Sequence, residues 1–262
     1  MRKLAILAVV LLAAAGAAGA QQAPSPNASP PPSPPPYGAP IDLARADLAA
    51  LVVPPFDVVA NLPYHVTSPI LHRLLGAEPR PDRCILMVQR EVAERVAARP
   101  GAMSYLSVFV QYHAAASLVR LVPRDAFEPA PAVESAIISL DVRPADGSGR
   151  LPPEMEDHLW RLVQTGFRER RKMLRNVLGR QIPVGQERVD AALAAAGIAG
   201  DRRPQTLAVT DWISLLGALG PLPPDHRGRH ASLAETDAAD LDGVADPDPC
   251  SDAGRGADAS PP

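Results

Sequence analysis

The chain has 262 residues, of which 47% are hydrophobic and only 4% aromatic, and its formal net charge at pH 7 is −3. This length allows one or two domains, and the small negative charge gives no overall basic signal for a nucleic-acid partner. The two cysteines, Cys84 and Cys250, exclude a disulfide-stabilised scaffold and the paired cysteine spacing of a zinc site. Cys84 lies in an apolar run and is expected to be a core residue.

Residues 1–20 have the features of a secretory signal peptide. Arg2 and Lys3 precede an apolar run, and Ala18-Gly19-Ala20 offers the small residues of a cleavage site. The alternative interpretation is a buried N-terminal helix. Residues 21–40 are rich in proline and have little apolar surface to bury, which favours an extended linker over a proline-rich docking ligand.

Residues 41–145 have the pattern of a partial α/β domain. Apolar runs predict strands at Phe56–Ala60, Cys84–Val88, Tyr105–His113, Ser117–Val122 and Ala136–Val142. The run at Cys84–Val88 is continuous, as expected for a strand that is buried on both faces. Helices are predicted from Thr67 or Ser68 to Leu75 and over Val92–Ala98. Strands that alternate with helices favour an α/β fold with a largely parallel sheet.

Residues 150–220 change to a helical pattern, which predicts a small all-α domain. Helices are expected at Glu154–Arg180, Val189–Ala196 and Thr210–Leu219. The first contains a basic run at Arg168–Arg175, which suits either contact with a phosphate backbone or a solvated helix face. Residues 221–262 hold nine acidic residues and three arginines with few large apolar groups, which predicts a disordered tail.

The predicted strand Phe56–Ala60 runs directly into Asn61-Leu62-Pro63-Tyr64. Ligands of α/β sheets bind beyond the carboxyl ends of strands, so a site is expected at this loop. The Asn61 amide offers an acceptor and two donors, and Pro63 restricts the backbone of Leu62. With the flat ring of Tyr64 beside them, these acceptors suit an adenine held by its exocyclic nitrogen. The alternative is a plain strand-to-helix turn that contains a proline.

Four segments occur in the order and roughly the spacing of the rRNA adenine N6-dimethyltransferases, and the chain resembles that family over about residues 43–219. These segments are Asn61–Tyr64, Val88–Arg95, Phe127–Ser135 and Phe167–Leu174, and Arg203–Leu207 resembles a later element of the family. The resemblance implies the C-terminal part of a class I (Rossmann-like) methyltransferase sheet, followed by a small all-α C-terminal domain.

The resemblance also implies S-adenosylmethionine as methyl donor, an adenine of small-subunit rRNA as acceptor of two methyl groups, and no metal. It assigns Asn61 and the Leu62 carbonyl to accept hydrogen bonds from the target amine, with Pro63 part of the same catalytic motif. Tyr64 and Phe127 are expected to sandwich an extruded base. Two residues are expected to contact the cofactor, Asp47 and Asn61. Five basic residues are expected to bind rRNA: Arg168, Arg170, Arg171, Lys172 and Arg175.

The family's first strands and its glycine-rich cofactor loop are not found before Asp47. We therefore expect an N-terminally truncated member of the family, in which the strand Phe56–Ala60 becomes an apolar edge of the sheet. The methionine and ribose parts of S-adenosylmethionine would then have few protein groups to bind them. Weak cofactor binding and impaired catalysis are expected for this reason.

Three functions stay open at this point. The first is rRNA adenine dimethylation by descent, the second is RNA binding without catalysis, and the third is an unknown role in an exported protein. The family implies a cytoplasmic monomer that works on the ribosomal subunit and has no stable membrane partner, whereas residues 1–20 imply export. Cofactor binding separates the first two functions, and a cleaved N-terminus separates the third from both.

Overall fold

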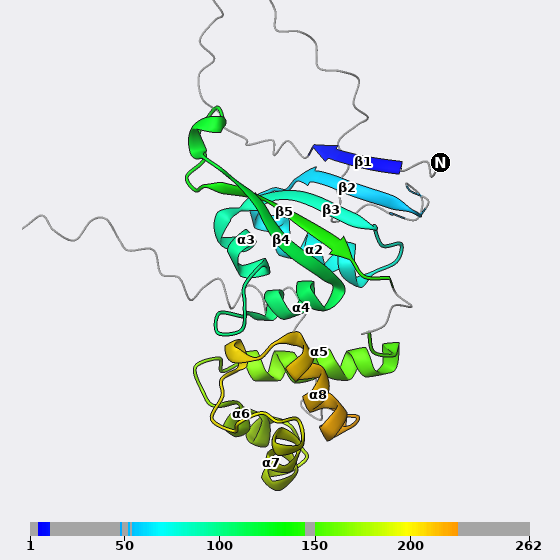
Figure 1. Ribbon diagram of the computed structural model, residues 1–262, viewed down its shortest axis with the longest axis vertical. Coiled ribbons are helices and arrows are strands. Elements are labelled where there is room, and N and C mark those ends of the chain that lie inside the picture. The colour runs from blue at the N-terminus through cyan, green and yellow to red at the C-terminus, as the bar shows by residue number, and fades with distance from the viewer. Residues whose placement is uncertain (1–4, 11–47, 49–51, 53, 145–149, 225–262) are drawn as a thin grey trace, which may run out of the picture.

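The structure is a computed structural model that describes residues 5–10, 48, 52, 54–144 and 150–224 (Figure 1). The predicted linker at residues 21–40 and most of the predicted acidic tail lie outside these residues. In the described part, no helix has both the length and the apolar character needed to cross a membrane.

A five-stranded sheet forms the upper part of the molecule in Figure 1. Its strands are β1 (Ala5–Val10), β2 (Phe56–Asn61), β3 (Arg83–Gln89), β4 (Ala114–Val122) and β5 (Ser135–Val142). Their order is β1-β2-β3-β5-β4, in which β2 is parallel to β1 and β3 while β5 is antiparallel to β3 and β4. The sheet is therefore mixed rather than largely parallel. The reason is that the loop 123–134 joins β4 to β5 without the long crossover that a parallel pair needs.

Strand β1 lies within the predicted signal segment and pairs in parallel with β2, from Ala5 opposite Phe56 to Val10 opposite Asn61. The expectation that β2 forms an unpaired edge of the sheet is therefore wrong, since its outer side meets the backbone of β1. The predicted cleavage site at residues 18–20 lies outside the described part of the chain, and the signal peptide stays a prediction.

Helices cover one face of the sheet: α2 (Thr67–Gly76), α3 (Arg90–Val96) and α4 (Tyr105–His113). Val58, Cys84 and Leu86 lie on this face and are fully buried, which confirms Cys84 as a core residue. Their neighbours Val59 and Ile85 are each 39% exposed. Strand β3 is therefore not buried on both faces as predicted, because the described helices pack on one face only.

The segment Tyr105–His113 is a helix, not the strand predicted from its apolar run. The Ser104 hydroxyl accepts a hydrogen bond from the Ser107 amide, and the Ser107 hydroxyl accepts one from the Ser104 amide. This reciprocal capping box starts the helix. Of the nine residues in α4, eight are buried. A helix buried on nearly all sides has no apolar stripe, so periodicity does not distinguish it from a buried strand.

A helical layer follows below the sheet in Figure 1: α5 (Pro153–Phe167), α6 (Leu174–Gln181), α7 (Gln186–Ala195) and α8 (Val209–Leu219). The predicted helix 154–180 is interrupted at residues 168–173. Helix α6 begins after them at Leu174, whose amide donates to the Arg202 carbonyl at 2.8 Å. The buried side chains of the sheet and of this layer form one hydrophobic cluster. The division into two domains near residues 145–150 stays a prediction.

Candidate active site

The carboxyl ends of β1, β2 and β3 meet at one edge of the sheet, and Asn61 is the last residue of β2. The amide of the next residue, Leu62, donates to the Met87 carbonyl at 3.0 Å, and the Leu62 side chain is only 1% exposed. Leu62 therefore anchors the segment in the core, while Asn61 is exposed at the edge. The two acceptors assigned by the family resemblance are thus adjacent on a backbone that β3 holds in place.

Pro63 and Tyr64 carry this segment into the short 3₁₀ helix η1 (Tyr64–Val66). The Pro63 carbonyl accepts a hydrogen bond from the Thr67 hydroxyl at 3.2 Å. The Tyr64 hydroxyl lies 2.7 Å from the hydroxyl of Ser135, which is the buried first residue of β5. Tyr64 is therefore held both through its backbone and at the far end of its ring, which restricts the ring at the edge of the sheet.

Phe127 lies in the loop 123–134, which connects β4 to β5 and projects beyond the sheet in Figure 1. It follows the short 3₁₀ helix η2 (Arg124–Ala126), and its side chain is partly exposed. The Arg124 Nε donates to the Pro131 carbonyl at 2.7 Å and closes the loop on itself. No ring contact joins Phe127 to Tyr64 among the described residues, so the sandwich around a base stays a prediction.

Arg90, the first residue of α3, connects the end of β3 to this loop. Its amide donates to the Glu134 carbonyl at 2.9 Å, and its Nη1 lies 2.7 Å from Glu134 Oε2. Its Nε lies 2.7 Å from Glu94 Oε1, one helical turn further along. The hydrogen bonds to Glu94 and Glu134 raise the pKa of the Arg90 guanidinium above its ordinary value.

The sequence alone does not single out Arg90, Glu134 or Ser135 as site residues. All three stand inside the segments that carry the family resemblance, Val88–Arg95 and Phe127–Ser135. The signal that could have found them is therefore the order of the motifs. What each side chain touches depends on the β3–β5 pairing, which places Gln89 opposite Ser135.

Asp47, which is predicted to contact the cofactor, lies outside the described residues. Asn61, the other predicted cofactor contact, is exposed beyond the carboxyl ends of parallel strands, where α/β sheets bind ligands. Among the described residues, no group of three or more histidine, cysteine or carboxylate side chains is placed to hold a metal ion.

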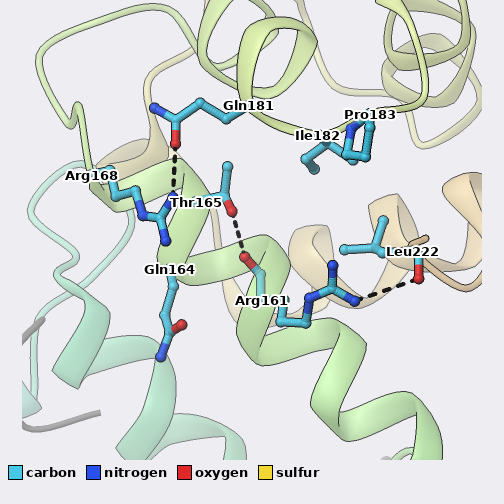
Figure 2. A pocket seen from close by; sticks show the side chains of 8 residues that line it. All are labelled: Arg161, Gln164, Thr165, Arg168, Gln181, Ile182, Pro183 and Leu222. Atoms are coloured by element: carbon cyan, nitrogen blue, oxygen red, sulfur yellow. Dashed lines mark hydrogen bonds between the residues drawn. The ribbon is translucent and has the colours of Figure 1, made fainter. Parts of the chain in front are cut away.

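The basic segment, residues 168–175, forms the turn between α5 and α6 and the start of α6, not the predicted continuous helix. The five predicted RNA-binding residues are all exposed: Arg168, Arg170, Arg171, Lys172 and Arg175. Arg168 donates to Gln181 Oε1 at 3.3 Å (Figure 2), and Arg175 lies 2.9 Å from Asp190 in an ion pair. Within the part of the chain that the structure describes, the side chains of Arg171 and Lys172 have no polar partner. These two cations are therefore available to an anionic ligand.

Figure 2 shows a small pocket beside this segment, between α5 and the chain after α6. The Arg161 side chain points toward Leu222. It donates to the Pro223 carbonyl at 2.6 Å and to the Leu222 carbonyl at 3.5 Å. Because Arg161 and Arg168 both donate to acceptors within the protein, this pocket joins elements of the helical layer.

In Figure 1 the strands β1, β2 and β3 run towards the left of the view, and α5 also ends on the left, where the turn to α6 begins.

Comparison with known proteins identifies the family. Residues 46–219 match the family described as ribosomal RNA adenine dimethylase. The chain is 41% identical over 192 residues to the ribosomal RNA small subunit methyltransferase A of Anaeromyxobacter sp. (strain K), a match that covers 68% of this chain and 66% of the relative. The protein of the same name from Geobacillus thermodenitrificans (strain NG80-2) is 41% identical over 196 residues, which covers 69% of this chain and 64% of the relative. The chain thus spans about two thirds of the length of these relatives.

Two solved structures share the fold. The 23S rRNA methyltransferase ErmE has a TM-score of 0.53 and 28% identity, covering 68% of this chain and 69% of that chain. A dimethyladenosine transferase from Plasmodium falciparum has a TM-score of 0.55 and 25% identity, covering 65% of this chain and 70% of that chain. These similarities confirm the predicted methyltransferase fold. Because the match over residues 46–219 contains all four segments of the resemblance, the chain belongs to the ribosomal RNA adenine dimethylase family.

Proposed function

We propose that this chain transfers methyl groups from S-adenosylmethionine to the exocyclic amine of an adenine in ribosomal RNA. One observation carries the proposal: the segment Asn61–Tyr64 lies at the carboxyl edge of the sheet, with Leu62 bound to β3 and Tyr64 bound to β5. Methyl transfer needs such a fixed segment, because the rate depends on the alignment of the reacting atoms.

Asn61 and Leu62 hold and orient the target amine in this proposal. S-adenosylmethionine supplies, when bound, a methyl group on a positively charged sulfur. The Asn61 side-chain oxygen and the Leu62 carbonyl accept hydrogen bonds from the two N–H groups of the amine. The nitrogen lone pair then points away from both acceptors. Positive charge that develops on this nitrogen then faces two preoriented oxygen dipoles. After the first methylation one N–H remains, and one of the two acceptors is enough to hold it for the second.

Tyr64 and Phe127 bind the two faces of the target base. An adenine inside a helix is out of reach, so the base must leave its stack. Stacking on an aromatic side chain contributes about 1–3 kcal/mol per base. Tyr64, which is fixed by Ser135, provides the immobile face, and Phe127 in the loop 123–134 provides the other.

Small-subunit rRNA is the substrate that we propose. The relatives named for the small subunit are 41% identical to the chain, whereas the 23S rRNA methyltransferase ErmE is 28% identical. The exposed basic residues of the segment 168–175 would contact the phosphate backbone. We further propose that the protein works as a monomer in the cytoplasm, where it meets the ribosomal subunit. Residues 1–20 predict export instead, and cell fractionation with sequencing of the mature N-terminus decides between the two locations.

The experiment incubates the purified full chain with S-adenosylmethionine and small-subunit rRNA that lacks dimethyladenosine, then digests the RNA and measures the nucleosides by mass spectrometry. Dimethyladenosine is the expected product, and Asn61→Ala should reduce its rate by about 10²-fold, as for loss of one preoriented polar group. Ser117→Ala, an exposed change on β4 away from the site edge, is the control and should keep full activity.

The alternative function, RNA binding without catalysis, rests on the exposed cations Arg171 and Lys172. It predicts that the full chain binds the rRNA in a filter assay and yet forms no methylated adenosine. The same preparation thus distinguishes the two functions.

A further inference from the structure

We propose that Arg90 and Glu134 are positioning residues that fasten the loop 123–134 and thereby place Phe127 over the Asn61–Tyr64 segment. This inference rests on the proposed function, since it assigns Phe127 to one face of the target base. It adds two residues that make no contact with the base and act through the loop.

The base of the loop is bound at two consecutive residues. Arg90 holds Glu134 twice, through its amide to the Glu134 carbonyl at 2.9 Å and through its guanidinium to the carboxylate at 2.7 Å. The next residue, Ser135, is held by the Tyr64 hydroxyl at 2.7 Å. The two bonds of Arg90 come from the start of α3 and the third comes from the site segment itself. The loop is therefore fixed relative to the residues that would hold the target amine.

Glu94 is the second carboxylate partner of the Arg90 side chain. Its carboxylate lies 2.7 Å from Arg90 Nε, which leaves Nη1 directed at Glu134. Arg90 therefore bridges a rigid helix and the loop, and only one of its two carboxylate partners belongs to the loop. This difference makes Glu94 a matched control for Glu134.

Exposure of the pair indicates that it contributes little to global stability. The side chains of Arg90 and Glu134 are 46% and 45% exposed. Exposed ion pairs contribute little to the free energy of unfolding. Among the described residues, the Arg124–Pro131 hydrogen bond lies within the loop and does not connect it to the sheet. Removal of the Glu134 carboxylate should thus loosen the loop and leave the fold intact.

The first measurement is amide hydrogen exchange of residues 124–134 in the full chain, which needs neither cofactor nor RNA. We expect exchange in the loop to be about two- to fivefold faster in Glu134→Ala and Arg90→Ala, as for loss of an exposed ion pair. Glu94→Ala should leave the loop unchanged, and Arg90→Lys should restore most of its protection. The melting temperature should differ little among the variants.

The second measurement is methyl transfer to small-subunit rRNA. In Glu134→Ala we expect kcat to fall about two- to fivefold while KM for the RNA stays constant, because the phosphate contacts are untouched. Glu94→Ala should keep the wild-type kcat. A merely structural role would instead lower the melting temperature and kcat together in the variants, Glu94→Ala included.

Equal exchange in the loop of Glu134→Ala and the wild type overturns this inference, as does an equal effect of Glu94→Ala. Absence of methyl transfer by the wild-type chain overturns the proposed function instead. In that case the exchange measurement still decides whether Arg90 and Glu134 fasten the loop.

Discussion

The Tyr64 hydroxyl lies 2.7 Å from the Ser135 hydroxyl, although 71 residues separate them in the chain. Tyr64 follows the end of β2 and Ser135 begins β5, so one hydrogen bond ties the site segment to the loop that carries Phe127. Ser135 is fully buried, and its hydroxyl is satisfied at this position through a residue from another part of the chain.

Tyr64→Phe should lower the free energy of unfolding by about 1–3 kcal/mol, since the buried Ser135 hydroxyl loses its partner. RNA binding should stay near the wild-type value, because the ring that stacks on the base is kept. Tyr64→Ala should weaken RNA binding as well. Denaturant unfolding and filter binding measure the two effects. The double variant Tyr64→Phe with Ser135→Ala should cost less than the sum of the single changes, and strict additivity would contradict the interaction.

Gly166→Ala should destabilise the helical layer by about 1–3 kcal/mol. A Cβ at Gly166 in α5 would lie 2.5 Å from a ring carbon of Trp212 and 3.2 Å from a Leu174 methyl carbon. Trp212 is fully buried in the core. Gly217→Ala in α8 is the matched control, because a Cβ there meets nothing within 4 Å. That change should stabilise the protein by about 0.5–1 kcal/mol. Thermal unfolding that ranks the two variants in the opposite order would refute this packing.

The free energy of unfolding should depend on pH through His113. Burial lowers the pKa of His113 from 6.5 to about 4, with smaller contributions from nearby His72 and Arg143. Its two ring nitrogens have no hydrogen-bond partner among the described residues. The unfolded chain therefore binds a proton below about pH 6.5 while the folded chain stays neutral at this ring down to about pH 4. Stability contributed by neutral His113 is complete above about pH 6.5 and is lost as the pH falls towards 4, by up to about 1.4 kcal/mol per pH unit.

His113→Phe removes this titration and keeps an aromatic ring beside Phe109 and Trp160, which flank His113 at ring-centroid distances of 4.6 Å and 5.7 Å. Urea unfolding at about pH 7.5 and pH 5 should show a smaller loss of stability for this variant than for the wild type. An equal loss in both proteins would assign the pH dependence to other groups.

The double variant Arg171→Gln with Lys172→Gln should weaken rRNA binding and reduce the slope of log K against log salt by about 1–2, roughly one for each phosphate that the variant no longer neutralises. Both side chains are exposed and have no polar partner in the described part of the chain, so the fold should not change. Arg83→Gln is the control for removal of a positive charge, because Arg83 lies at the amino end of β3 in an ion pair with Asp141. An unchanged salt slope in the double variant would remove the basic segment from the RNA interface.

Local sequence patterns determined most of the elements in this protein. The apolar runs at Phe56–Ala60 and Cys84–Val88 correspond to β2 and β3, since apolar content and the flanking turn residues are local properties. The order of the motifs around Asn61, Glu91, Phe127 and Arg171 was enough to identify the family. Local patterns predicted the wrong element where burial is nearly complete. The apolar run of α4 predicts a strand, and the segment is a helix.

Only the tertiary structure decided which side chains meet. The helix predicted over 154–180 is divided before Leu174, whose amide binds the Arg202 carbonyl, a contact that no local pattern contains. Arg90 reaches Glu134 because β3 and β5 pair antiparallel with Gln89 opposite Ser135. The sequence by itself thus determined the family, the site segment Asn61–Tyr64 and the basic segment. The pairing of distant strands determined that the loop of Phe127 is fastened to that segment, because hydrogen bonds between residues far apart in the chain exist only once the sheet has formed.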